Sequence, residues 1–529
     1  MDNLPNPPQD DSSASQNQSH QPPSETAPPA PLDDHTASLP NPPSQPDSQT
    51  PNQAEPPSTP PPPNQPPSDP PPQDDSSAPQ PAKPPVKTSP FKWLAPILIG
   101  LVIVAAIGFA VYKFVLQDNS QDASNGTAQS APATTLSYYG LWEASQIMQP
   151  VFEQFQKNNP NVKVNYQVHS SADYRQRLQT ALSSDNPPDI VRIHSTWIPS
   201  FASQLQPAPQ SLISPSDIDS SFYSVISNQV LYNGQVYAIP LNFDSLVLYV
   251  NHDLIGDSQV PTNWLDLQKL ARQTTQKDPN TGQITQAGLA LGTTTNVDHW
   301  PDIVSLMLLQ NGVDLSQLQS EPTLETLKFY LLFNNSQQPT WSTALPSSTQ
   351  AFISGKLAFY LAPTWRIPQI KQANPAFNWK THPVPQLPQA PVVNWSNFWV
   401  EAVPKSNENT QISWQLLKFL ASSNAQQTLF QSANQARGYA QPPANKNLQN
   451  QIATNPLVAP VVQQASSAQT FYTTGTTHDG ETGINSRLIK YLEDALNALS
   501  KNPNDEQVIS TLQNGFNQVL SQYQLNSAQ

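Results

Sequence analysis

Residues 237–251 read YAIPLNFDSLVLYVN. This stretch places one acid, Asp244, between an aromatic-rich apolar run and the six residues SLVLYV. The apolar run predicts a buried strand. A carboxylate beside it costs desolvation free energy unless it is paired or hydrogen-bonded. Two roles are open for Asp244 from the sequence: it contacts the hydroxyls of a bound ligand, or it accepts hydrogen bonds from neighbouring backbone N–H groups.

The residues before this stretch alternate between strand and helix patterns. Strand patterns occur at 136–142, 162–168 and 189–194, and helical spacing occurs at 147–155 and 174–182. This alternation predicts βαβ units and a mostly parallel sheet. Ligands of such sheets bind at the carboxyl ends of the strands. Here those ends carry the sequences GLWE (140–143) and HSTW (194–197).

Helical patterns dominate the later part of the chain. They occur at 302–312, 324–333, 413–422, 424–433 and 486–499. The chain beyond residue 116 is too long for one ordinary hydrophobic core, which favours two lobes.

The first 92 residues differ sharply in composition. The chain has 59 prolines, and nearly half of them lie in this segment, which contains very few large apolar residues. Such a segment cannot bury enough apolar surface to offset its ordering entropy, so we predict a disordered, partly polyproline-II tail. The tract PPPPNQPPSDPPP (60–72) is either a solvated spacer or a ligand for proline-binding modules.

Residues 93–116 contain an uncharged apolar run, LAPILIGLVIVAAIGFAVY (94–112). With its flanks the run reaches the roughly 20 residues that a membrane-spanning helix needs. A cleaved signal peptide is the alternative, but its apolar region is shorter and lies near the start of a chain. The lysines before the run place residues 1–92 in the cytoplasm and the rest outside the cell membrane. A polar linker follows at 117–135.

Several function classes lack support in the sequence. The chain has no cysteine and a formal net charge of −14, so neither a thiolate metal site nor a basic nucleic-acid surface is expected. No hydrolase, metalloprotease or phosphate-loop motif occurs, and the histidines lack metal-ligand spacing. We therefore predict no enzyme activity and no cofactor. The turn DPNTGQI (278–284) lacks the ligands of a calcium loop and is predicted to be a hairpin.

Five motifs together carry a resemblance to a known family. They are a GLWE strand end followed by FEQFQKNNPNVKV (152–164), NPPDIVRIHSTW (186–197), YNGQVYAIPLNFDSLVLYVNHDLI (232–255) with VPTNWLDL (260–267), GKLAFYLAPTWRI (355–367), and FWVEAVPKSNENTQISWQLLKFL (398–420). In this order the chain resembles the extracellular solute-binding proteins of family 1, the maltose-binding-protein-like components of bacterial ABC importers. The resemblance covers roughly residues 136–529.

The resemblance implies an α/β, two-lobed periplasmic-binding-protein-like fold of type II that closes over a ligand in the cleft. Crossovers between the lobes are expected near Ser245–Leu248 and Asn397–Glu401. Lobe 1 would comprise about 136–244 and 402–440, and lobe 2 about 249–396 and 445–529.

A polyol cleft needs aromatic faces for stacking and a few hydrogen-bonding side chains. The motif positions offer eleven such residues: Trp142, Glu143, His194, Trp197, Asp244, Trp300, Trp365, Arg366, Trp395, Trp399 and Tyr472. Each has a structural alternative. A tryptophan at a strand end can belong to the core, Glu143 can be a solvated acid in a first helical turn, and Arg366 can pair with an acid instead of meeting an anionic ligand.

The sequence thus predicts a membrane-anchored solute receptor that captures a sugar or similar polyol outside the cell and delivers it to ABC permease subunits. Two alternatives remain. One is a sensor that signals through its proline-rich tail. The other is a surface glycosidase, because the two carboxylates of such an enzyme are paired in space and not in sequence.

Overall fold

The structure is a computed structural model that describes residues 133–256, 258–405 and 408–525. These residues all belong to one compact unit of the chain. The predicted tail (1–92) and membrane helix (93–116) lie outside the described residues, as does most of the linker (117–135). Within the described ranges, no helix is long and apolar enough to cross a membrane.

The first of two large sheets has the strand order β2-β1-β3-β13-β6. Its strands are β1 (Thr134–Leu141), β2 (Val162–His169), β3 (Ile190–His194), β6 (Ala238–Pro240) and β13 (Trp399–Ala402). β1 is parallel to both β2 and β3, whereas β13 is antiparallel to β3 and β6. The three predicted strands and their parallel pairing are therefore confirmed.

The second sheet is built around β7 (Asp244–Asn251), the strand quoted at the outset. Its order is β14-β12-β7-β10-β9-β8, and β11 also pairs with β7. The other strands are β8 (Gln276–Lys277), β9 (Ile284–Leu289), β10 (Leu357–Pro363), β11 (Trp379–His382), β12 (Asn394–Asn397) and β14 (Ala468–Gln469), and a separate hairpin joins β4 (Leu231–Tyr232) to β5 (Gln235–Val236). All eight residues of β7 are buried, because strands flank it on both sides and helices cover its faces.

The chain passes between the two sheets at three crossovers, the last of which lies between β13 of the first sheet and β14 of the second. It leaves the first sheet at Pro240 and enters the second at Asp244. It returns through Phe398, between β12 and β13, within the range expected for the second crossover. The segment 245–248, where we expected the first crossover, instead lies inside the second sheet. The reason is that its side chains complete the buried core of that sheet, so the change of lobe happens earlier in the chain.

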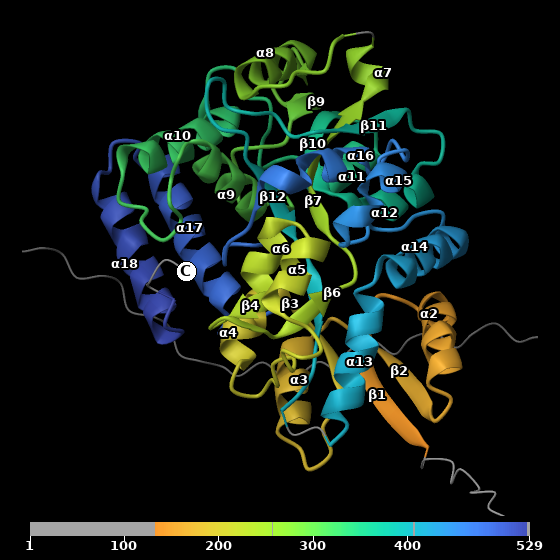
Figure 1. Cartoon of the computed structure of the whole chain (residues 1–529). Helices are drawn as coiled ribbons and strands as arrows, with labels where there is room; N and C mark the ends of the chain where they lie inside the picture. The colour runs from red at the N-terminus through yellow and green to blue at the C-terminus, as the bar shows by residue number, and fades with distance from the viewer. Residues whose placement is uncertain (1–132, 257, 406–407, 526–529) are drawn as a thin grey trace, which may run out of the picture. The chain divides into compact units, whose positions relative to one another are not determined.

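Helices cover both sheets. Those associated with the first sheet are α2 (Ser145–Asn158), α3 (Tyr174–Leu182), α4 (Ile198–Phe201), α5 (Pro215–Ser221), α6 (Ser224–Val230), α13 (Thr410–Leu420) and α14 (Ser423–Arg437). α14 packs on α2 and α2 on β2, as Figure 1 shows. The chain thus returns to the first lobe after most of the second sheet has formed and then goes back to add β14.

The remaining helices surround the second sheet or follow it in the chain. They are α7 (His252–Ile255), α8 (Trp264–Thr274), α9 (Trp300–Gln310), α10 (Glu321–Asn335), α11 (Ser348–Ile353), α12 (Ile367–Ala373), α15 (Gln449–Ile452), α16 (Ala459–Gln464), α17 (Ile484–Lys501) and α18 (Gln507–Gln522). α17 and α18 lie side by side in Figure 1. All seven predicted helical segments, including the two in the first lobe, are confirmed within a few residues at each end.

Candidate functional site

The candidate residues gather where three strands end. β1 ends just before Trp142, and β3 ends at His194, which is followed by a short 3-10 turn, Ser195–Trp197. In the second sheet, β10 is followed by a similar turn, Thr364–Arg366. Carboxyl ends of strands are the usual ligand sites of α/β folds. The crossover from Pro240 to Asp244 and the crossover through Phe398 both lie beside these three strand ends. We take them as the candidate site.

An aromatic cluster lies at the end of the first sheet. The ring of Trp142 is 47% exposed and meets Trp399 edge to face, with 4.7 Å between ring centroids. Trp399 in turn contacts both Trp197 and His194, each at 5.2 Å. The ring of His478 also lies near Trp142, with 6.3 Å between ring centroids. A buried aromatic base thus supports one solvent-facing indole, which suits stacking against an apolar ring face.

The backbone at Trp142 adopts a conformation that side chains rarely take. Its φ is 59°, and the N–H of Glu143 donates to the carbonyl of Leu141 at 2.7 Å, which closes a three-residue turn. The buried Arg192 also donates to the Leu141 carbonyl, at 3.2 Å, and the hydroxyl of Tyr166 donates to the Glu143 carbonyl at 3.0 Å. Positive φ costs about 1–2 kcal/mol for a residue other than glycine. The neighbouring donors hold this strained turn in place.

Glu143 is buried, so it is not a solvated acid of a first helical turn. Its Oε1 pairs with Nη2 of Arg437 at 3.0 Å, from a helix 294 residues further along the chain. The other oxygen, Oε2, is buried and has no hydrogen-bond partner among the described residues. One oxygen of this buried acid is thus held by Arg437, and the other has no hydrogen-bond partner among the described residues.

The second sheet presents Trp365 and Arg366. The guanidinium carbon of Arg366 lies 4.4 Å from the ring centroid of Trp365, a cation–π contact. Its Nε donates to Nε2 of His299 at 3.1 Å, and its Nη1 donates to the side chain of Gln369 at 2.8 Å. Both side chains are half-buried. An acid partner was one of two alternatives for Arg366, and among the described residues no acid forms an ion pair with it; His299, Gln369 and the indole face of Trp365 contact the guanidinium.

Asp244 is buried at the first crossover and accepts hydrogen bonds from five donors of the protein. Oδ1 accepts from the N–H of Ser245 (2.8 Å) and from both the N–H and the hydroxyl of Thr364 (3.1 and 2.8 Å). Oδ2 accepts from the N–H of Trp365 (3.0 Å) and the amide of Gln441 (3.2 Å). Burial raises the pKa of this carboxyl, and these donors oppose the rise. Of the two roles open from the sequence, the structure shows the backbone acceptor.

Three other candidates lie in the interior. His194 is buried, and its ring nitrogens meet the hydroxyl of Thr196 and the side-chain oxygen of Asn397, both at 2.7 Å. Trp197 and Trp395 are almost fully buried. Helices and crossovers pack over these three side chains and exclude solvent from them. The three residues therefore support the strand ends from within the protein.

Trp395 also shows how its neighbourhood is held together. Its Nε1 donates to Oδ1 of the buried Asp302 at 2.7 Å, and the other oxygen of Asp302 accepts from the N–H of Gly475 at 3.1 Å. Burial raises the pKa of Asp302 to about 6. Trp300, at the start of α9, is buried as well, and Tyr472 is half-buried against Phe471, at 5.4 Å.

Two buried histidines of the site, His194 and His299, are neutral at physiological pH. Burial lowers the pKa of His194 to about 4 and that of His299 to about 3. The neighbouring Arg366 contributes to the shift of His299. Neither ring therefore supplies a positive charge to a ligand at pH 7.

Sequence reasoning missed two residues of this site. Arg437 pairs with Glu143, and the exposed His478 lies beside Trp142. Neither stands in a motif, and both come from segments far along the chain from the strand end that they reach. Only the packing of α14 on α2 and the course of the chain before α17 bring them there.

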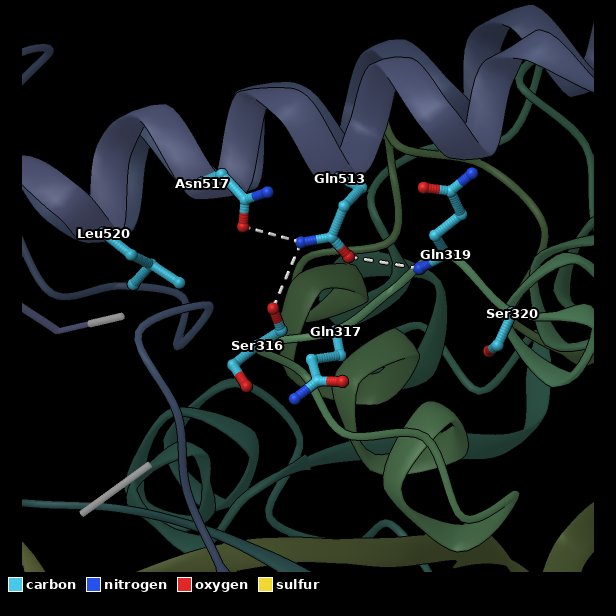
Figure 2. A pocket seen from close by; sticks show the side chains of 7 residues that line it. All are labelled: Ser316, Gln317, Gln319, Ser320, Gln513, Asn517 and Leu520. Atoms are coloured by element: carbon cyan, nitrogen blue, oxygen red, sulfur yellow. Dashed lines mark hydrogen bonds between the residues drawn. The ribbon is translucent and has the colours of Figure 1, made fainter. Parts of the chain in front are cut away.

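Other ligand chemistry finds little support. The described residues contain no group of three histidine or acidic side chains that could hold a metal ion. A cavity of about 490 Å³ lies away from the strand ends, between α18 and the loop before α10. Figure 2 shows that Gln513 of α18 spans it, with its amide bonded to Ser316, Gln319 and Asn517. This cavity is a seam between helices without an aromatic side chain.

Comparison with known proteins defines the class. A profile of the family described as bacterial extracellular solute-binding protein matches residues 151–502. This match covers more than half of the chain, so the chain belongs to the bacterial extracellular solute-binding proteins. The fold agrees: the sugar-binding protein MalE from Xanthomonas citri superposes with a TM-score of 0.60 at 20% identity, covering 74% of this chain and 98% of that one.

The relatives come from several bacteria. The maltooligosaccharide ABC transporter solute-binding lipoprotein of Streptococcus pneumoniae is 24% identical over 299 residues, which is 53% of this chain and 68% of that protein. The maltodextrin-binding protein MdxE of Bacillus subtilis is 26% identical over 276 residues, 48% of this chain and 61% of that protein. The predicted maltose-binding-protein-like family is therefore confirmed, and a role in binding the solute of an ABC transporter follows from it.

Proposed function

We propose that this protein captures a sugar or similar polyol outside the cell and delivers it to the permease subunits of an ABC importer. The observation that carries the proposal is the half-exposed indole of Trp142, held on an aromatic base at the end of β1. Sugar rings present apolar faces that stack on such indoles, and their hydroxyls need only neutral hydrogen-bonding partners.

Within the candidate set we assign direct ligand contacts to Trp142, Trp365, Arg366 and Trp399, whose side chains retain exposed surface. The residues that support these contacts from within the protein are Glu143, His194, Trp197 and Trp395. Asp244 accepts hydrogen bonds at the first crossover. No catalytic step is assigned to the chain. The pneumococcal and Bacillus relatives, named for maltooligosaccharide and maltodextrin, support a carbohydrate as the solute.

The proposal includes the anchoring of the protein. We propose that residues 93–116 form a single-pass membrane helix, with the proline-rich tail in the cytoplasm and the type II two-lobed domain (136–529) outside. Its support is the uncharged apolar run with lysines on one side.

The test is a thermal-shift screen of the purified full-length chain against maltooligosaccharides, monosaccharides, polyols, peptides and phosphates. A solute at 100 times its dissociation constant should add about 2.7 kcal/mol to the unfolding free energy. A response to carbohydrate that is lost in Trp142→Ala supports the proposal. Stabilisation by a peptide or an anion, without a response to any carbohydrate, would overturn the sugar assignment. Hydrolysis of an oligosaccharide that depends on one carboxylate would replace it with a glycosidase.

A further inference from the structure

The segment RGYAQ (437–441), between the end of α14 and the residues that lead into the second lobe, touches both buried acids of the candidate site. Arg437 pairs with Glu143, and the side chain of Gln441 donates to Asp244 at 3.2 Å. The first acid belongs to the end of the first sheet and the second to the start of β7. One short segment therefore holds a carboxylate in each lobe.

Tyr439 completes this connection. Its carbonyl accepts a hydrogen bond from Nε of Arg437 at 3.0 Å. Its hydroxyl is buried and lies 2.8 Å from the hydroxyl of Thr364. Because the single hydroxyl hydrogen of Thr364 goes to Asp244, the Tyr439 hydroxyl is the donor of this pair. A continuous chain of polar contacts thus runs from Glu143 through RGYAQ to Asp244.

Glu143 and Asp244 each lie next to one of two indoles that we assign to the solute, those of Trp142 and Trp365. Glu143 directly follows Trp142, and its carbonyl and carboxylate are both held by the protein. Asp244 accepts from the N–H of Trp365. Any shift of RGYAQ would therefore displace backbone or side-chain atoms that lie within one residue of Trp142 and of Trp365. A bound solute that touches both rings depends on their separation, so this contact chain also acts on affinity.

We propose that RGYAQ is a strut that positions Trp142 and Trp365 relative to each other, so that Arg437, Tyr439 and Gln441 set the affinity for solute without contacting it. The inference rests on the proposed function, in which both indoles meet the solute. It goes beyond that function because it assigns a role to three residues that are not among those proposed to contact the solute.

The test uses the full-length chain labelled with 5-fluorotryptophan and the variant Tyr439→Phe. This change deletes one hydroxyl and keeps the ring. We expect the fluorine resonances of Trp142 and Trp365, identified through their Trp→Phe variants, to move without ligand, and the dissociation constant for maltotriose to rise at least fivefold. The buried core residues Trp264 and Trp341 are internal references whose resonances should stay in place.

The matched control is Tyr330→Phe. Tyr330 is also buried and also loses one hydroxyl hydrogen bond, to the carbonyl of Thr293, but it lies outside the contact chain. Its affinity should equal that of the wild type. The strut is refuted if Tyr439→Phe keeps wild-type resonances and affinity, or if Tyr330→Phe weakens binding as much at an equal loss of stability.

If Tyr439→Phe folds poorly, a second variant provides an independent test of the strut. Gln441→Met removes only the contact to Asp244 from a half-buried position, so the Trp365 resonance should move more than that of Trp142. The reverse order would contradict the proposed connectivity. If wild-type Trp142 and Trp365 do not respond to maltotriose or to any other carbohydrate, the proposed function fails, while the ligand-free resonances still test the strut.

Discussion

The carboxylate of Asp244 accepts a hydrogen bond from the backbone N–H of Trp365 at 3.0 Å, across 121 residues of sequence. The contact ties the first crossover between the lobes to the strand end that carries the indole. A buried acid with four further protein donors is satisfied without a ligand. The following predictions start from this geometry and from its counterpart in the first lobe.

We expect Asp244→Asn to lower the free energy of unfolding by about 1–3 kcal/mol, because the amide group turns an N–H toward donors that then lack an acceptor. Urea denaturation measures this loss. The control is Asp278→Asn, in an exposed turn that accepts from the N–H groups of Asn280 and Thr281, where the change should stay near 0.5 kcal/mol. Full stability with loss of solute binding would instead make Asp244 a direct ligand contact.

For Trp142, we compare glycine with alanine. Both variants remove the indole and should weaken carbohydrate binding by up to about tenfold, measured by titration calorimetry. Because φ is positive at this position, Trp142→Gly should be more stable than Trp142→Ala by about 1 kcal/mol. The exposed Leu265, changed to alanine, serves as the control for loss of a surface apolar group. Equal stability of the two Trp142 variants would show that the turn relaxes.

Breaking the ion pair between Arg192 and Glu401, near the Trp142 turn, should lower the free energy of unfolding. Arg192 and Glu401 lie 2.6 Å apart, and both are almost fully buried. We expect Arg192→Leu to destabilise the fold by about 3–5 kcal/mol, because it leaves the carboxylate of Glu401 buried without its partner. The double variant Arg192→Met/Glu401→Met should recover most of this loss. If it is no more stable than the single variant, the unpaired charge is not the cause.

The buried His194 makes stability depend on pH. Its pKa is about 4 in the folded chain, against 6.5 for an unperturbed histidine. Between pH 6.5 and pH 4, His194 binds a proton in the unfolded chain but not in the folded chain. The contribution of the neutral His194 to stability is therefore present above pH 6.5 and is lost as pH falls toward 4. The loss is about 1.4 kcal/mol per pH unit. In His194→Asn, the unfolding free energy between pH 5 and 6 should fall less steeply by about that amount. An unchanged slope would show that the ring is protonated in the folded chain.

Part of the order of elements was predictable from the sequence, because each segment repeats its apolar residues with its own period. This part comprises three strands and two helices before residue 195, the strand β7 and five later helices. The run SLVLYV predicts a buried strand, and β7 is one. Trp142 and Trp365 were also identified from the sequence, because they stand in the motifs GLWE (140–143) and GKLAFYLAPTWRI (355–367).

What the sequence could not decide is which of these side chains face solvent. Trp142 directly follows β1 and Trp395 lies within β12, yet Trp142 is half-exposed and Trp395 is buried against Asp302. The same applies to the acids: Glu143 meets Arg437, and Asp244 meets Gln441, across 294 and 197 residues respectively. Local periodicity determines an element and its apolar face. Burial and the pairing of charges depend on which distant segments pack over that element, and for this chain only the tertiary structure shows that both acids are buried.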